Sequence, residues 1–420
     1  QSGSGGTLIN LSISGGSQHS SSHQKSREDI LQSSQLTGDS GVYLNIRGKG
    51  AGSTLNITGS DLGGSAVTML NVEGKKTFQA AETRREIHSD QHSGGGGGGI
   101  ALQGGSNGGG LGITANANIG KGETNGQSTT YRLSHIGGLS GHTDIGDGKT
   151  LLNGAQILGK SIDGNTRDLE IHSPQGTMDY QSKQNALSGS VLYGYGVAVN
   201  LDYQNTRVDA HEKTVNVESG HRDAVRGVQE SDNSRIQALT SSIKQNDAQA
   251  NKGQDKTGGV SGFYAGDDGY RIHNTGTTVL GGLITSTAKA EAEGKNHFST
   301  DRLVREEIHN YSNYKGKSIA LGVSTVLSGD TLEQGEAQRR EFMDVGKSGV
   351  GKTFGIGHTE KHKEGLTVGS INTANLTIHD DAGQRQLTGE SAAEAAKNAN
   401  RGITLEHVKE HNGTTSVSFD

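Results

Sequence analysis

An alternation of apolar with small or polar residues over 191–203 is the clearest pattern in this chain. Seven odd-numbered positions carry apolar or aromatic side chains: Val191, Tyr193, Tyr195, Val197, Val199, Leu201 and Tyr203. Most of the positions between them are small or polar. Because successive side chains of a β-strand point to opposite faces of a sheet, a period of two predicts a strand with one apolar face. We expect this long strand to contact a membrane or another sheet.

Two further segments show the same alternation. Apolar residues occupy most odd-numbered positions of 111–119 and 319–327, and each segment follows a polar or charged one. The sequence therefore predicts three extruded antiparallel hairpins that project from a β stem, over 78–136, 177–220 and 295–330. Residues 221–258 are polar, and we interpret them as a loop insertion.

A short phrase, glycine, any residue, threonine and then leucine or valine, recurs along the chain. Its copies lie at 5–8, 52–55, 148–151, 276–279 and 365–368. Glycine suits a turn, whereas threonine and valine suit a strand. Internal repetition of this kind is typical of solenoids. The prediction is an all-β fold in which 1–420 form a single elongated parallel β-helix interrupted by the hairpins.

The C-terminal part, 365–420, contains one helical signal. Residues 391–400 read SAAEAAKNAN, with Ser391 at the N-cap position and Glu394 three residues later. This spacing is that of a capping box and predicts a short helix near 391–400.

Composition restricts the possible functions. Only 29% of the residues are hydrophobic, which argues against one large globular core. Proline occurs once, at Pro174, as expected of hydrogen-bonded strands rather than of a disordered chain. Cysteine is absent, so disulfides and thiolate metal sites are excluded. The net charge of −6 gives no electrostatic support for nucleic-acid binding.

Candidate catalytic groups are few. The pairs Asp267–Asp268 and Asp380–Asp381 stand near glycine, and we interpret them as turn residues, because aspartate favours turns. His358 and His362 have the spacing of metal ligands on a helix, but their segment is typical of a strand or loop. The sequence therefore predicts no catalytic residue, no metal site and no cofactor. A carbohydrate-active β-helix enzyme is the least favoured alternative.

Several segments resemble a known family. Residues 276–288 (GTTVLGGLITSTA), 295–300 (KNHFST) and 301–314 resemble the haemagglutinin-type repeats of large two-partner-secretion exoproteins. These include filamentous haemagglutinin and the effectors of contact-dependent growth inhibition. Residues 54–61 (TLNITGSD) and 180–200 are similar to the same region. The resemblance covers most of the chain and implies the second, downstream repeat block.

The resemblance implies a right-handed parallel β-helix, secreted to the bacterial cell surface through an outer-membrane transporter of the two-partner type. It further implies a non-enzymatic stalk that assists toxin delivery across the outer membrane of a target cell. The alternative is an adhesin repeat that binds glycans or proteins of a host surface. The residues leave open the oligomeric state, and whether the hairpins enter a membrane or pack on one another.

Overall fold

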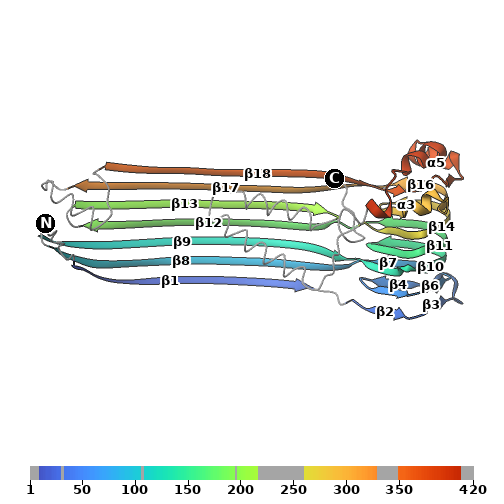
Figure 1. Cartoon of the computed structure of the whole chain (residues 1–420), viewed down its shortest axis with the longest axis horizontal. Coiled ribbons are helices and arrows are strands. Elements are labelled where there is room, and N and C mark those ends of the chain that lie inside the picture. The colour runs from blue at the N-terminus through green and yellow to red at the C-terminus, as the bar shows by residue number, and fades with distance from the viewer. Residues whose placement is uncertain are drawn as a thin grey trace, which may run out of the picture.

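The structure is a computed structural model that describes residues 9–29, 33–105, 108–193, 196–215, 260–328 and 349–407. Within these residues the chain forms two β-sheets and a few short helices, so the all-β class expected from the sequence is confirmed. Figure 1 shows a stem at one end, from which the long strands extend in one direction.

The stem is a 13-stranded sheet whose strands pair in parallel. Its strands are β2 (Gln35–Gly38), β3 (Gly41–Ile46), β4 (Leu55–Thr58), β5 (Asp61–Gly64), β6 (Val67–Val72), β7 (Lys76–Gln79), β10 (Ser134–Asn153), β11 (Ala155–His172), β14 (Gly262–Leu280), β15 (Leu283–Ser286), β16 (His297–Arg305), β19 (Ser370–Ile371) and β20 (Leu376–Ile378). The long strand β10 pairs in turn with β5, β6 and β7. One long strand therefore pairs along its length with three short strands that follow one another in the chain.

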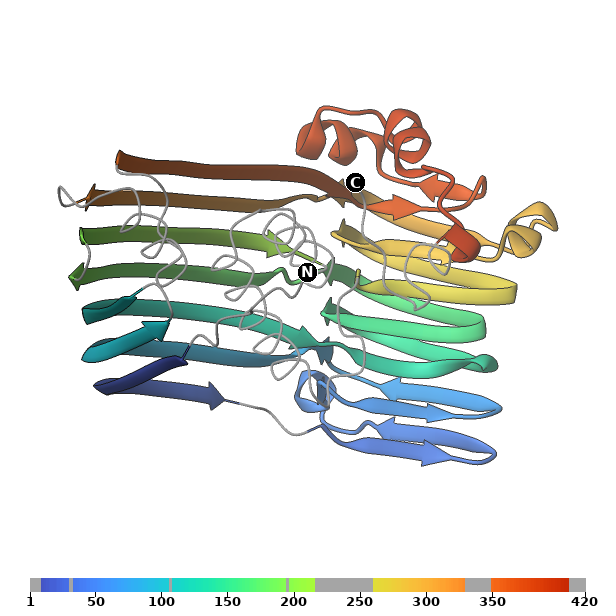
Figure 2. The same ribbon diagram turned by 60° about the vertical axis from the view of Figure 1, so that its left-hand side comes forward.

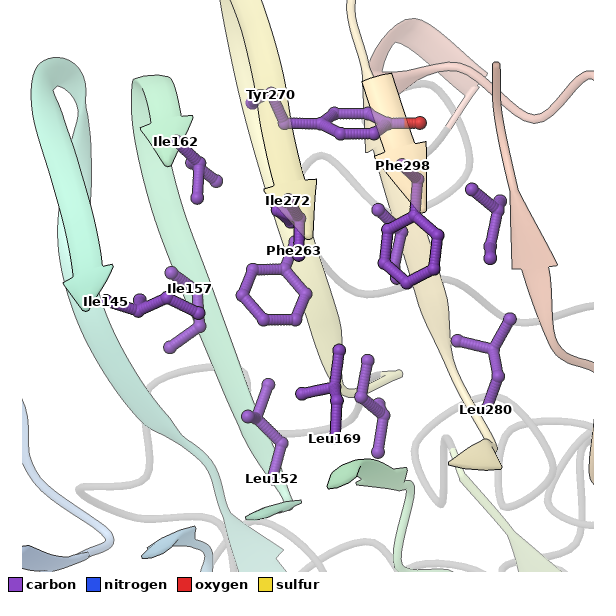
Figure 3. Packing of buried hydrophobic residues seen from close by; sticks show 14 of the residues in the cluster. Ile145, Leu152, Ile157, Ile162, Leu169, Phe263, Tyr270, Ile272, Leu280 and Phe298 are labelled. Atoms are coloured by element: carbon purple, nitrogen blue, oxygen red, sulfur yellow. The ribbon is translucent and has the colours of Figure 1, made fainter. Parts of the chain in front are cut away.

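Apolar side chains stack in register through the stem. Successive parallel partners form one ladder: Leu36, Leu62, Ile136, Ile157, Phe263, Ile284 and Ile371. Every member except Leu36 is buried. Figure 3 shows Ile157 and Phe263 beside one another in this core, with Leu152 and Leu280 of a second ladder nearby. Burying one such side chain contributes roughly 1.5–3 kcal/mol, so the stack holds successive strands together.

Three short helices lie at the C-terminal end of the stem (Figure 2): α3 (Ala288–Ala292), α5 (Asp381–Thr388) and α6 (Ala392–Ala399). The side chain of Gln384 on α5 donates to the carbonyl of Leu303 at 2.8 Å and accepts from its N–H at 2.7 Å. The helix therefore replaces a further strand at this position of β16. Helix α6 lies within the range predicted from the sequence, and Ser391 and Glu394 form the capping box.

The long strands form a seven-stranded antiparallel sheet in the order β1-β8-β9-β12-β13-β17-β18. They are β1 (Ile9–Asp29), β8 (Ala81–Gly105), β9 (Gly108–Arg132), β12 (Gly176–Tyr193), β13 (Gly196–Thr214), β17 (Glu307–Ser328) and β18 (Gly349–Val368). Chain segments that leave the stem as one strand return to it as the next, so each pair is a hairpin inserted between two parallel strands of the stem.

The hairpins can be compared with the ranges expected from the sequence. The hairpin of β8 and β9 falls within 78–136, and that of β12 and β13 runs from Gly176 to Thr214, beginning one residue before the expected 177–220. The expected range 295–330 is wrong, because it joins the stem strand β16 to β17, whereas β17 returns to the stem as β18. The apolar alternation ends near 327, and it gave no sign that the partner strand begins at Gly349. The expected loop 221–258 lies outside the described residues.

Candidate contact surface on the long sheet

One face of the long sheet gathers the exposed apolar side chains. Residues directly opposite one another on paired strands share a face, so the register assigns each side chain to one side. The exposed residues on this face are Ile13, Ile100, Ile113, Ile119, Leu187, Val191, Tyr193, Val199, Leu201, Tyr203, Ile319, Leu321, Val323, Phe354 and Ile356. We call this set the apolar band. Contiguous exposed apolar surface of this kind marks an interaction site.

The band extends over several rows along the strands. Among the residues whose side chains the structure describes, its outermost row runs through Ile13, Ile100, Ile113, Tyr193 and Val197 across five neighbouring strands. A second row, six residues nearer the stem, runs through Ile119, Leu187, Tyr203, Leu321 and Phe354. Ile319 and Ile356 extend the band by two residues on β17 and β18. At about 3.4 Å per residue the band is roughly 20–27 Å deep.

The band is uneven across the sheet. At its depth the edge strand β1 carries Ser17 and His19, and β8 carries a run of glycines. The other edge strand, β18, carries the exposed Lys352 beside Val323. The apolar side chains therefore concentrate on β9, β12, β13, β17 and part of β18.

Over the middle rows of this depth the opposite face of the same sheet is polar. One row there contains Gln18, Asn118, Ser188 and Asp202 on four different strands. The sheet is thus amphipathic, because one face is apolar while the other offers hydrogen-bonding groups and glycines.

Six of the seven residues expected to form one strand lie on two strands. Val191 and Tyr193 end β12, whereas Val197, Val199, Leu201 and Tyr203 lie on β13; Tyr195 is outside the described residues. The prediction of a single strand is wrong, because β12 and β13 are antiparallel partners with Tyr193 opposite Val197. This register pairs odd positions with odd positions, so the period of two continues through the reversal of the chain.

Other members of the band were missed as candidate residues. Phe354 and Ile356 on β18 are more than half exposed and alternate with glycine and polar residues. Ile13 on β1 belongs to a similar alternation with serine. The period of two was therefore present in both segments, but it extends over few residues, because Lys352 and His358 flank Phe354 and Ile356, and Gly15 follows Ile13.

A separate groove lies on the outer side of the stem. It has a volume of about 640 Å³ and is lined by polar and apolar residues of β11, β14, β16 and β20 and of the segment leading into β20. Arg271 donates to both carboxylate oxygens of Asp163 at 2.6 and 3.1 Å, and the rings of His273 and His379 lie edge to face at 6.1 Å. Within the described residues no cluster of His, Asp and Glu has the arrangement of a metal site.

The aspartate pairs considered as catalytic groups have structural partners. Asp380 is the N-cap of α5, where it accepts from the N–H of Gly383 at 2.8 Å. This hydrogen bond and the guanidinium of Arg302 lower the pKa of the Asp380 carboxyl. Asp267 and Asp268 form ion pairs with lysines, including Lys289 at 3.7 Å and Lys160 at 3.4 Å. These carboxylates stabilise the stem and do not converge on one cleft.

The parallel stem, the antiparallel arms and the exposed apolar face define an all-β repeat protein. Among the described residues no helix is long and apolar enough to cross a membrane. Residues 13–188 match the sequence model of a family described as Hemagglutinin repeat. The resemblance identified in the sequence is thereby confirmed, and the matched segment belongs to the haemagglutinin-repeat family.

Curated relatives share this similarity. The chain is 27% identical over 385 residues to Toxin CdiA of Escherichia coli, covering 90% of this chain and 11% of that protein. It is 28% identical over 339 residues to tRNA nuclease CdiA of Yersinia mollaretii, covering 79% of this chain and 10% of that protein. Deoxyribonuclease CdiA of Yersinia pseudotuberculosis is 25% identical over 424 residues, covering 98% of this chain and 33% of that protein. No solved structure matches this chain.

The chain spans about a tenth of the length of the first two of these relatives. The nuclease activities in their names belong to those whole proteins. The segment that this chain resembles is a repeat region.

Proposed function

We propose that this chain is a non-enzymatic repeat segment of a large exoprotein, secreted to the bacterial cell surface through an outer-membrane transporter of the two-partner type. Its stem is a spacer, and its long hairpins enter the outer membrane of a target cell and assist delivery of a toxin. The similarity to proteins named Toxin CdiA and tRNA nuclease CdiA supports this assignment. The haemagglutinin-repeat match supports the same assignment.

We also propose that the stem is a right-handed parallel β-helix. The parallel pairing of each stem segment with the next, and the in-register ladder from Leu36 to Ile371, support this architecture. Such a stem places successive hairpins side by side, because adjacent strands of a sheet are about 4.8 Å apart. The hairpins then form one continuous sheet.

The depth of the apolar band is the observation that carries the membrane proposal. Strands that cross outer membranes carry an outward apolar band about 25 Å tall and need about 9–11 residues each. The described rows of the band span a comparable depth, and one of these rows crosses five neighbouring strands. A satellite sheet packed in water would hide this face, yet Tyr193 is 62% exposed and Ile119 is 66% exposed.

Flotation of the protein with vesicles of bacterial polar lipids tests this proposal. Val199→Asp places a charge within the band, and Asn200→Asp places the same charge on the opposite face of the same strand. We expect Val199→Asp to weaken flotation by at least about ten-fold, because a charge on the lipid face is costly, whereas Asn200→Asp retains it. Absence of flotation in the unmodified protein would falsify membrane entry.

A second candidate function, an adhesin repeat that binds host glycans, is favoured by the groove on the stem. The Asp163–Arg271 pair, His273 and Asn375 present fixed donors and acceptors along one open surface. A glycan array probed with the unmodified protein and with Asn375→Ala tests it. Binding that is lost in the variant supports an adhesin, and absence of binding to any glycan contradicts it.

A further inference from the structure

A row of mostly charged residues borders the apolar band on its stem side. The row crosses all seven long strands in register: His23, Asp90, Glu123, Lys183, Arg207, Lys317 and His358. It lies two residues beyond Ile319 and Ile356, the last apolar residues of β17 and β18. On β17 and β18 the change from apolar to charged side chains therefore occurs within one row, whereas β9 already carries Lys121 in the row of Ile319.

Three neighbours in this row carry the same charge. Lys183 on β12 lies opposite Arg207 on β13, and Arg207 lies opposite Lys317 on β17. All three side chains are exposed. Directly opposite residues of an antiparallel pair have Cβ atoms about 4.5–5.5 Å apart, and like charges in such positions destabilise the sheet. Repulsion between the three cations therefore destabilises the sheet, and an anion bound between them would remove this repulsion.

The chain itself compensates only part of this charge. Arg207 donates to Asp209 at 2.9 Å, but within the described residues Lys183 and Lys317 form no ion pair. Glu123 lies opposite Lys183, yet its carboxylate accepts from the side chain of Asn125 at 3.1 Å and is not within ion-pair distance of the lysine. Elsewhere in the row, Asp90 is paired with His88 at 3.0 Å and His358 with Glu360 at 3.4 Å.

We propose that Lys183, Arg207 and Lys317 form a binding site for the phosphate of lipid headgroups that carry a net negative charge. The inference rests on the proposed entry of the hairpins into a membrane. If the apolar band lies in the hydrocarbon layer, this row lies at the level of the headgroups. Lysine extends its ammonium towards such an interface, and arginine pairs with phosphate through two parallel hydrogen bonds. Because the chain as a whole carries a net charge of −6, attraction to an anionic surface must be local.

Vesicles of defined composition test the site. One set contains phosphatidylcholine alone, and the other contains phosphatidylcholine with phosphatidic acid, whose headgroup is a phosphomonoester. The test variant is the double substitution Lys183→Gln with Lys317→Gln. The control is Lys213→Gln with Lys397→Gln, which removes the same charge from exposed lysines nearer the stem and on α6.

We expect the test variant to bind vesicles with phosphatidic acid about 10- to 30-fold more weakly than the unmodified protein, since each cation near an anionic surface contributes about five-fold. The control variant should bind like the unmodified protein, and binding to phosphatidylcholine alone should not distinguish the three. Inorganic phosphate should compete only at concentrations far above those of the lipid, because a free ion lacks the adjoining apolar contact.

The outcomes separate this site from the membrane proposal. Equal binding to both vesicle types by the unmodified protein overturns the phosphate site and leaves membrane entry standing. An equal loss in the control variant also overturns it, because the effect is then one of overall charge. Full displacement by inorganic phosphate at concentrations equal to those of the lipid assigns the row to free phosphate and contradicts a headgroup site. No binding to either vesicle type contradicts both proposals.

Discussion

Lys76 lies fully buried in the stem, where its ammonium donates a hydrogen bond to the backbone carbonyl of Asp147. Burial lowers the pKa of this lysine from 10.5 to about 8, although the nearby carboxylates of Asp147 and Asp144 partly oppose the shift. A lowered pKa means that the folded stem holds the proton less tightly than the unfolded chain does. The charged form of Lys76 therefore destabilises the fold.

The pH dependence of stability follows from this shift. Between pH 8 and 10.5 the unfolded chain binds the proton of Lys76 and the folded chain has lost it, so this residue makes the free energy of unfolding rise with pH in that window. Lys76→Met should flatten this rise and stabilise the stem at pH 7 by about 1–3 kcal/mol. Urea unfolding at pH 7 and 9.5 measures both effects. Lys75→Met, at the exposed neighbouring position, should change neither; an equal effect there contradicts the explanation.

Asn274 links three adjacent strands inside the stem. Its side-chain oxygen accepts from the hydroxyl of Thr166 at 2.9 Å and from the N–H of Leu169 at 3.1 Å, and its amide donates to Thr278 at 2.9 Å and Thr300 at 3.2 Å. Asn274→Ala leaves several buried groups without partners, so we expect it to lower the free energy of unfolding by about 2–4 kcal/mol. Asn71→Ala, which removes an exposed amide bonded to Asn45, should cost less than about 1 kcal/mol in the same denaturation series. Equal losses would contradict the role assigned to burial.

At the scale of elements, α6 is the feature that local sequence determines most directly. Ser391 accepts from the N–H of Glu394 at 3.2 Å, and the Glu394 carboxylate accepts from the N–H of Ser391 at 2.8 Å. Ser391→Ala should reduce stability by about 1 kcal/mol and lower hydrogen-exchange protection in α6, while Ser391→Asp should preserve both. Protection that is the same in all three proteins would show that packing on the stem alone fixes this helix.

The strands show which features a local sequence pattern predicts and which it does not. The period of two in 191–203 predicted an extended backbone with one apolar face, and the face is as expected. It did not predict the reversal between β12 and β13, because a register that pairs odd with odd positions leaves the period unchanged. Stem pairs such as Ile157 and Phe263 are separated by a whole hairpin, and no local pattern relates them. Parallel neighbours are therefore specified by stacking in the folded stem rather than by adjacent residues.

At the scale of the whole molecule, the long sheet has two unpaired edges among the described residues. β1 pairs only with β8, and β18 pairs only with β17. Each edge offers about half of its backbone groups along some twenty residues, which water satisfies in solution. In the hydrocarbon layer no water is available, and each unpaired group there costs several kcal/mol. Entry into a membrane therefore requires that another strand pair with each edge.

In vesicles made only of lipid no other protein supplies such strands, and every long strand among the described residues already lies in the sheet, so we expect a second copy of this chain to supply them. We therefore predict that the protein is a monomer in dilute solution and contains at least two copies in each assembly when it is embedded in lipid. Because the chain has no cysteine, a single introduced Cys on the polar face, such as Ser188→Cys, gives one fluorescent label per copy. Counting photobleaching steps in lipid nanodiscs measures the number of copies. A single step in the embedded protein would show that the hairpins lie on the bilayer surface, where water still reaches both edges, and the proposed entry into the membrane would then be wrong.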